Sequence, residues 1–275
     1  MKLDEVLPAH CHARARRLLA EVHAIREEMG RTEDAREAPA VTGALPRECY
    51  FEAIVAWRKA GRLAAELGVE VAQQVPGAPA LGEVRPGHVL QLIQGALAQV
   101  EAARQRLGIP EPAPEPAIEP ASHPSDVLVT LIRINRELSR ALERPFTPSD
   151  VYRTVALASA YAARLGAKAQ PAAFERRRRP AHCYERLEAC LARASTLIAA
   201  RGGSALAVRG APANVLPGDV YDLANLVLGE VAYLHALVPD AAPVHAFEPE
   251  PGGHRLPSHV YQLASTLEGQ LASLA

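Results

Sequence analysis

The sequence predicts an all-α protein of eight amphipathic helices, arranged as two tandem four-helix units in a helical bundle. The first observation is composition: 49% of the residues are hydrophobic but only 4% are aromatic, which is typical of packed helices and not of β-sandwiches or barrels. The second is a short motif opening with proline that recurs along the chain. The third is that apolar residues recur at intervals of three and four after each copy.

The motif reads proline, a mostly small residue, an acid or histidine, valine or cysteine, and then usually tyrosine or leucine. The copies begin at Pro8, Pro46, Pro86, Pro124, Pro148, Pro180, Pro217 and Pro257. Proline suits the first helical position, because its missing N–H would have no intrahelical partner there. An acid at the third position can accept amide hydrogens of the first turn and complements the positive end of the helix dipole. Each copy therefore predicts a helix start.

The residues after each motif support this prediction. In the last segment the apolar positions are Val260, Leu263, Leu267, Leu271 and Leu274. Spacing of this kind places the apolar residues on one face of a helix. We expect valine or cysteine at the fourth motif position to begin the buried stripe, and tyrosine at the fifth to bury its ring with its hydroxyl near solvent.

The linkers suggest that the chain arose by duplication. The sequence Gly-Ala-Pro-Ala precedes both the third helix (77–80) and the seventh (210–213). A linker rich in Glu and Pro leads into the fourth helix (111–120) and into the eighth (248–253). Helices one to four therefore correspond to helices five to eight.

The duplication predicts one four-helix unit over residues 1–144 and a second over residues 145–275. The units join at residues 144–147, the shortest connection between helices. General frequencies favour up-and-down helix order, for which short loops suffice. The linkers inside each unit are longer than that, and a return along a helix of roughly 30 Å needs about ten extended residues. An all-parallel arrangement is therefore left open.

Net charge, targeting signals and cysteine spacing limit the kinds of partner and the compartment that we expect for this protein. The formal charge is −1, from 30 basic and 31 acidic residues, so no overall field attracts nucleic acid or anionic lipid. We expect no secretory signal and no membrane span, because charged or polar residues interrupt every apolar run. The four cysteines, Cys11, Cys49, Cys183 and Cys190, form no CxxC pair. We therefore expect the cysteines to act as small apolar residues in a protein of the reducing cytoplasm.

The third motif position carries the most chemistry. Its residues are His10, Glu48, His88, Asp126, Asp150, His182, Asp219 and His259. If helix starts converged, histidine could lie beside carboxylate, the arrangement that orients a metal ligand or a general base. The alternative is that each residue only accepts an amide hydrogen of its own helix, which neutral histidine can also do.

Other candidate residues are less specific. Arg176–Arg179 is a dense basic run that could clamp a phosphate or an acidic partner, or simply be solvated. Trp57 is the only tryptophan, and its spacing from Ile54 favours core or partial exposure. The sequence contains no HExxH, Walker or GxSxG pattern.

These observations predict a non-enzymatic scaffold or binding protein that engages a protein or a small apolar ligand, on a bundle groove or through the Pro-rich linkers. We expect no catalytic residues, no cofactor and no metal. The alternative is a ligand or metal sensor, or an enzyme, whose His/carboxylate site forms where helix N-termini converge. Homo-oligomer formation is left open.

Overall fold

The computed structural model describes residues 3–32, 37–70, 83–238 and 253–275, and it confirms the all-α class. The helices are α1 (Pro8–Glu28), α2 (Pro46–Glu66), α3 (Pro86–Arg106), α4 (Pro124–Ala141), α5 (Pro148–Arg164), α6 (Pro180–Ala200), α7 (Pro217–Ala236) and α8 (Pro257–Ala272). A 3₁₀ turn, η1 (Leu3–Glu5), and two short strands, β1 (Ala40–Thr42) and β2 (Ala207–Arg209), complete the described elements. Each helix begins at the proline of one motif copy, as predicted.

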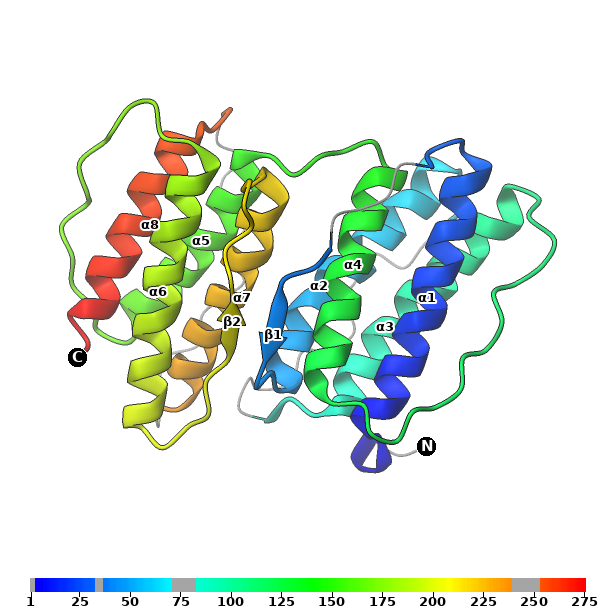
Figure 1. Cartoon of the computed structure of the whole chain (residues 1–275), viewed down its shortest axis with the longest axis horizontal. Helices are drawn as coiled ribbons and strands as arrows, with labels where there is room; N and C mark the ends of the chain where they lie inside the picture. Colours follow the sequence, from blue (N-terminus) through cyan, green and yellow to red (C-terminus); the bar gives the residue numbers. More distant parts are fainter. Residues whose placement is uncertain (1–2, 33–36, 71–82, 239–252) are drawn as a thin grey trace. The chain divides into compact units, whose positions relative to one another are not determined.

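The chain divides into two compact units, Met1–Pro145 and Phe146–Ala275. Unit 1 holds α1 to α4 and unit 2 holds α5 to α8 (Figure 1). In unit 1, α1 and α2 each contact both α3 and α4; in unit 2, α5 and α6 each contact both α7 and α8. Both units therefore share the ring order first, third, second, fourth helix. A duplicated four-helix unit predicts this likeness, and the duplication itself stays a hypothesis. Residues 77–80 and 248–252, on which part of it rests, lie outside the described residues.

All four helices of each unit run in the same direction. The opening prolines of α1 to α4 line one pocket, and those of α5 to α8 line another. Between α1 and α3, Cys11 contacts Pro86 at the helix starts, and Glu21 pairs with Arg104 further along both helices. The up-and-down order favoured by general frequencies is therefore wrong. The parallel order is adopted, because each long linker carries the chain back to the same end.

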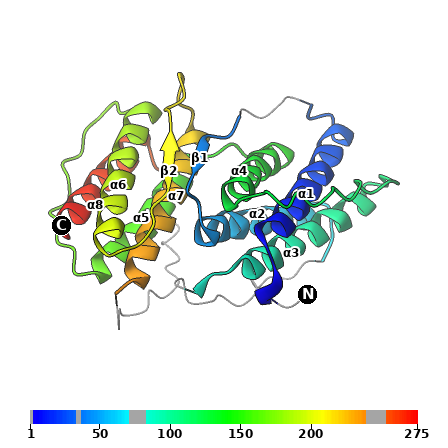
Figure 2. The same cartoon turned by 60° about the horizontal axis from the view of Figure 1, so that its bottom comes forward.

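The returning linkers between α3 and α4 and between α5 and α6 lie along the sides of their bundles (Figures 1 and 2). In unit 2, the backbone N–H groups of Lys168, Ala172 and Arg178 donate to hydroxyls at 2.9, 3.0 and 3.2 Å. The acceptors are Ser273, which directly follows α8, and Thr266 and Ser258 on α8. The linker numbers rise while the α8 numbers fall, so the linker runs antiparallel to the helix. Side-chain oxygens of α8 thus satisfy backbone donors that have no helix of their own.

The core of each unit consists mainly of aliphatic side chains. The largest fully buried ones are Leu18, Ile25, Leu63, Leu92, Ile93, Leu128, Leu131, Ile132, Ile134, Leu138, Leu187 and Ile198. Trp57 is also buried, and Gly95 of α3 lies against it: a Cβ at Gly95 would be 2.8 Å from the indole Nε1. Among the described residues, no helix combines the length and hydropathy needed to cross a membrane.

Candidate functional site

The third motif residues cap the helices that they belong to. In each of the eight helices, this side chain accepts a hydrogen bond from the backbone N–H three residues earlier. His10, His88, His182 and His259 use Nδ1, each at 3.0 Å from the donor nitrogen. A ring nitrogen that accepts a hydrogen bond carries no proton, so in each of these caps the ring N–H is on Nε2. Glu48, Asp126, Asp150 and Asp219 accept through a carboxylate oxygen.

Helix α5 completes this cap in both directions. Thr147 donates its backbone N–H to Asp150 at 2.9 Å, and Asp150 donates its backbone N–H to the Thr147 hydroxyl at 3.3 Å. Two backbone donors at the helix start are thereby satisfied. Leucine holds the place of Thr147 in α1, α2, α7 and α8, and an aliphatic side chain offers no acceptor in return.

The second and fifth motif positions hold the linker that leads into a neighbouring helix. Arg178 lies two residues before the opening proline of α6, and its backbone N–H donates to Ser258 Oγ, at the second position of α8. The Arg178 guanidinium lies 4.3 Å from the ring centroid of Tyr261, at the fifth position of α8. Two residues of the α8 motif therefore bind the residue that leads into the α6 motif.

The same relation recurs around both rings. Arg255, two residues before α8, donates its N–H to Ser149 Oγ and stacks on Tyr152 of α5 at 4.5 Å. Phe146, two residues before α5, stacks on Tyr221 of α7 at 4.6 Å, beside Gly218. In unit 1, Ala44 donates its N–H to Ser125, and the Ser122 hydroxyl lies 2.9 Å from Nδ1 of His12. The repeated pentapeptide is thus a docking surface for its neighbour as well as a helix start.

The cysteines strengthen this ring. Three thiols donate to the opening proline of the neighbouring helix in the ring, each at 3.2 Å. Cys11 of α1 donates to the Pro86 carbonyl of α3, Cys49 of α2 to Pro124 of α4, and Cys183 of α6 to Pro257 of α8. Burial raises the pKa of Cys11, Cys183 and Cys190 to about 12, and the pKa of the Cys49 thiol is raised well above its ordinary value for the same reason. These thiols stay protonated, so they are not nucleophiles near neutral pH.

The helix starts of each unit surround an apolar pocket, which we call its mouth. The mouth of unit 1 is lined by Pro8, Cys11, Pro46, Cys49, Pro86, Val89, Pro124 and Val127. The mouth of unit 2 is lined by Pro148, Val151, Pro180, Cys183, Pro217, Val220, Pro257 and Val260. Leu7, Leu216 and Leu256, which directly precede three of these prolines, are among the most exposed large hydrophobic residues. The convergence that a His/carboxylate site requires is therefore present, but prolines and aliphatic side chains line the pocket.

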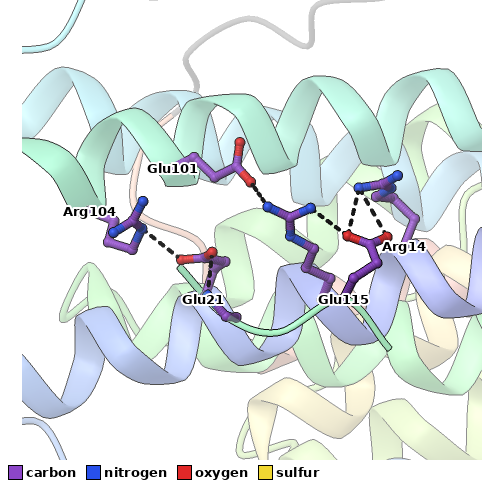
Figure 3. A network of polar contacts seen from close by, with 7 residues as sticks. Arg14, Glu21, Glu101, Arg104 and Glu115 are labelled. Atoms are coloured by element: carbon purple, nitrogen blue, oxygen red, sulfur yellow. Dashed lines mark hydrogen bonds and ion pairs between the residues drawn. The ribbon is translucent and has the colours of Figure 1, made fainter. Parts of the chain in front are cut away.

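A second polar cluster lies in unit 1, where the linker between α3 and α4 crosses α1 (Figure 3). The Glu21 and Arg104 side chains are almost completely buried and pair at 3.1 Å. Glu21 Oε1 accepts the backbone N–H of Ala113 at 2.9 Å, and Arg104 Nη1 donates to the carbonyl of Ile109 at 2.6 Å. This ion pair therefore fixes the linker backbone at two points.

Arginines of α1 contact the acids of the same linker. Arg17 bridges Glu101 of α3 and Glu115 of the linker, at 2.6 and 2.5 Å. Burial alone would lower the pKa of Arg17, but its contacts with Glu115 and Glu101 outweigh burial and raise it. Arg14 also pairs with Glu115, at 3.3 Å, and Arg16 pairs with Glu119. The sequence analysis did not single out these residues.

Unit 2 has aromatic rings where unit 1 has the buried ion pair. Tyr161 and His235 stand as far along α5 and α7 as Glu21 and Arg104 stand along α1 and α3. Their rings pack edge to face with centroids 5.4 Å apart. The two units therefore share a fold but differ in the chemistry of this surface.

His12 is not arranged as a catalytic relay. Its Nδ1 lies 2.9 Å from Ser122 Oγ and 4.0 Å from Glu119 Oε2, so serine and acid face the same nitrogen. A serine–histidine–acid relay uses opposite ring nitrogens. Burial lowers the pKa of His12, against the opposing effect of Asp126 and Glu119.

The arginine run 176–179 is divided between structural contacts and solvent. Arg178 pairs with Glu175 and stacks on Tyr261, whereas Arg176 and Arg177 are exposed.

No cluster of three or more His, Cys, Asp or Glu side chains suited to a metal ion occurs in the part of the chain that the structure describes. Comparison of the chain with protein-family models, curated proteins and solved structures found no match.

Proposed function

We propose that this protein is a non-enzymatic helical scaffold whose mouths bind an aliphatic side chain of a protein partner. The observation that carries the proposal is the coincidence of an apolar pocket with exposed leucines at the helix starts. Leu7, Leu216 and Leu256 are 58%, 42% and 48% exposed. Leu7 directly precedes a mouth proline of unit 1, and Leu216 and Leu256 directly precede mouth prolines of unit 2. Exposed apolar residues next to an apolar pocket favour an interaction surface.

The identity of these residues supports the proposal. A Ser, Thr, Asp or Asn at the same place would cap the helix and stabilise it by about 1 kcal/mol relative to an aliphatic residue. Leucine gives up that cap and exposes a hydrophobic side chain. A departure from local preference of this kind is expected at functional positions.

The dimensions of the mouths favour a single side chain. Even with open solvent counted, the mouths span only about 190 Å³ in unit 1 and about 270 Å³ in unit 2. Cofactor and drug-sized sites span about 300–1,000 Å³. One aliphatic side chain that contacted the prolines and valines of a mouth would bury apolar surface against them.

The surrounding polar groups favour binding over catalysis. The third motif residues act as helix caps, and the high pKa of the buried thiols makes them poor nucleophiles. The free cysteines, all buried, fit a protein of the reducing cytoplasm.

Methyl NMR with an alkyl probe tests the proposal. Titration with 1-hexanol should shift the methyl signals of Val151, Val220 and Val260 saturably. Val155, which is buried one turn further along α5, is the internal control. Val220→Phe, which fills the mouth of unit 2, should abolish the shifts.

Two outcomes would contradict the proposal. One is the absence of saturable shifts at the three mouth valines, and the other is an equal response at Val155. If zinc instead broadened the imidazole signals of His182 and His259 at stoichiometric amounts, the alternative of a metal sensor would take precedence.

A further inference from the structure

The linker between α3 and α4 is held on α1 as an extended peptide is held in a binding site. Its contacts follow the chain in order, from Ile109 at Arg104, through Ala113 at Glu21 and Glu115 at Arg17, to Ser122 at His12. The linker numbers rise from 109 to 122 while the α1 numbers fall from 21 to 12. The linker therefore runs antiparallel to α1.

The surface that receives the linker contains buried charge. Side-chain exposures of Glu21 and Arg104 are 0% and 7%, and both use their polar atoms on the linker backbone. A backbone segment without secondary structure of its own suits such a clamp, because its N–H and C=O groups need partners. Removal of the linker would leave Glu21 and Arg104 paired with each other but without their backbone partners in the linker.

The linker sequence matches this surface. Residues 109–122 read IPEPAPEPAIEPAS. Prolines at alternate positions favour the extended polyproline II conformation, so the segment loses little conformational entropy when it is held in that conformation. Glu115 and Glu119 supply the negative charges opposite Arg14, Arg16 and Arg17. The recognised features are thus an extended backbone, prolines and acids spaced four residues apart.

The acidic part of the linker, beyond the buried Glu21–Arg104 pair, is held by contacts that solvent weakens. The side chains of Glu115 and Glu119 are 53% and 55% exposed, and exposed ion pairs contribute little and are screened by salt. Ile118, the largest aliphatic residue between the two acids, is 54% exposed and so adds little burial. Segments with few buried apolar contacts open more readily than the core.

We propose that the surface of α1 and α3 formed by Arg14, Arg16, Arg17, Glu21 and Arg104 is a binding site for an extended, acidic, proline-rich segment of a partner protein. The chain's own linker occupies the site and competes with the partner. Tethering gives the linker a high effective concentration, so the partner binds only the fraction of molecules in which the linker is released. This site is separate from the mouths, and its failure would leave the mouth proposal unaffected.

The test uses the full chain and a fluorescein-labelled peptide of residues 109–122, followed by fluorescence anisotropy at low salt. The variant Glu115→Gln/Glu119→Gln weakens the linker without changing its prolines. It should bind the peptide about tenfold more tightly than the unaltered chain, because the ion pairs of Glu115 with Arg14 and Arg17 and of Glu119 with Arg16 no longer compete. Adding Arg14→Gln and Arg17→Gln to this variant should remove the gain.

Matched controls separate recognition from nonspecific attraction. Arg164→Gln removes an exposed arginine of α5 in unit 2 and should leave peptide binding unchanged. A peptide in which glutamine replaces each glutamate should bind at least about tenfold more weakly, and added salt should weaken binding of the glutamate peptide. Circular dichroism of every variant checks that the helices are retained.

The proposal is overturned if the Glu115→Gln/Glu119→Gln variant binds the peptide no better than the unaltered chain. It is equally overturned if the glutamine peptide binds as well as the glutamate peptide, or if the arginine variants retain the gain while still helical. Substituting Glu21→Gln provides a second control, because it removes the Ala113 clamp from the linker and from the peptide alike and should therefore give no gain in peptide affinity.

Discussion

The thiol of Cys183 donates a hydrogen bond to the carbonyl oxygen of Pro257, 3.2 Å away in the neighbouring helix. Equivalent bonds join Cys11 to Pro86 and Cys49 to Pro124. The fourth residue of one motif thus contacts the first residue of another. Through such contacts, repetition of a local helix signal also specifies how the helices meet.

The buried thiols should react only when the protein unfolds. The pKa of Cys183 is about 12 because of burial, and the thiolate is the reactive form. A disulfide reagent at neutral pH should therefore label all four cysteines at the rate of unfolding, and urea should accelerate the labelling. Rapid stoichiometric labelling of any cysteine in the folded protein would contradict this prediction.

The reciprocal cap of α5 should show energetic coupling. Thr147→Ala and Asp150→Ala should each lower the free energy of unfolding by about 0.5–2 kcal/mol, since each removes one partner of the cap. The double variant should lose less than the sum, because the Thr147 hydroxyl also donates to Asp150 Oδ2 at 2.6 Å, and either single change already breaks that shared bond. Asp150→Asn should cost less than Asp150→Ala. Urea denaturation of the four variants and the unaltered chain measures these values, and strict additivity would show that the two residues act independently.

Two helical glycines should respond in opposite ways to substitution by alanine. A Cβ at Gly95 would lie 2.8 Å from Trp57 Nε1, so Gly95→Ala should lower the free energy of unfolding by about 1–3 kcal/mol. A Cβ at Gly269 would lie 3.4 Å from Ala169 Cβ, an ordinary contact. Gly269→Ala should therefore stabilise the protein by about 0.5–1 kcal/mol through helix propensity. Equal effects in thermal unfolding would mean that helix packing at Trp57 is looser than described.

Acid should weaken unit 2 through Glu268. Burial alone would raise the pKa of Glu268, but hydrogen bonds and charge from Arg186 and Arg193 outweigh burial and lower it below 4.5. The folded state therefore binds this proton less readily than the unfolded state. Its contribution to stability is present above pH 4.5 and is lost as the pH falls through the lowered pKa.

Comparison with Glu268→Gln isolates this effect. The variant should be less stable than the unaltered chain at neutral pH, and the difference should shrink when urea denaturation is repeated below pH 4.5. A difference that stayed constant with pH would assign the role of Glu268 to packing and not to its charge.

The two units should fold separately. Fragments 1–144 and 146–275 each contain four complete helices and the linkers between them. Each fragment should be substantially helical by circular dichroism when expressed alone. Two disordered fragments would indicate that the eight helices fold only as one body.

The sequence predicted the helix starts because their determinants are local. Proline at the first position and an acceptor at the third satisfy the special needs of a helix N-terminus, wherever the helix lies in the fold. The helix direction was not predicted. The general preference for up-and-down bundles comes from bundles whose helices are joined by short loops, and the loops of this chain are long. The long linkers were the informative signal, since a chain that alternates direction does not need them.

The candidate site was predicted less completely. The capping role of residues such as His88 and Asp126 follows from their place in the helix. It could therefore be predicted beside the alternative of a His/carboxylate site. The roles of Arg17 and Glu21 depend on the path of the linker, which the sequence of α1 does not encode. The signal that could have revealed them is the four-residue spacing of Glu115 and Glu119 in a proline-rich segment, opposite a cluster of arginines.

The ring order also has a consequence for folding speed. Helices α1 and α2 are consecutive in the chain but stand diagonally, and the contacts of α1 are made with α3 and α4. The bond from Cys11 to Pro86 spans 75 residues, and so does the bond from Cys49 to Pro124. Loop closure of this length must precede the packing that rewards it, which slows folding. We therefore expect refolding slower than in helical bundles of similar size with short loops, and closer to the rates of β-proteins.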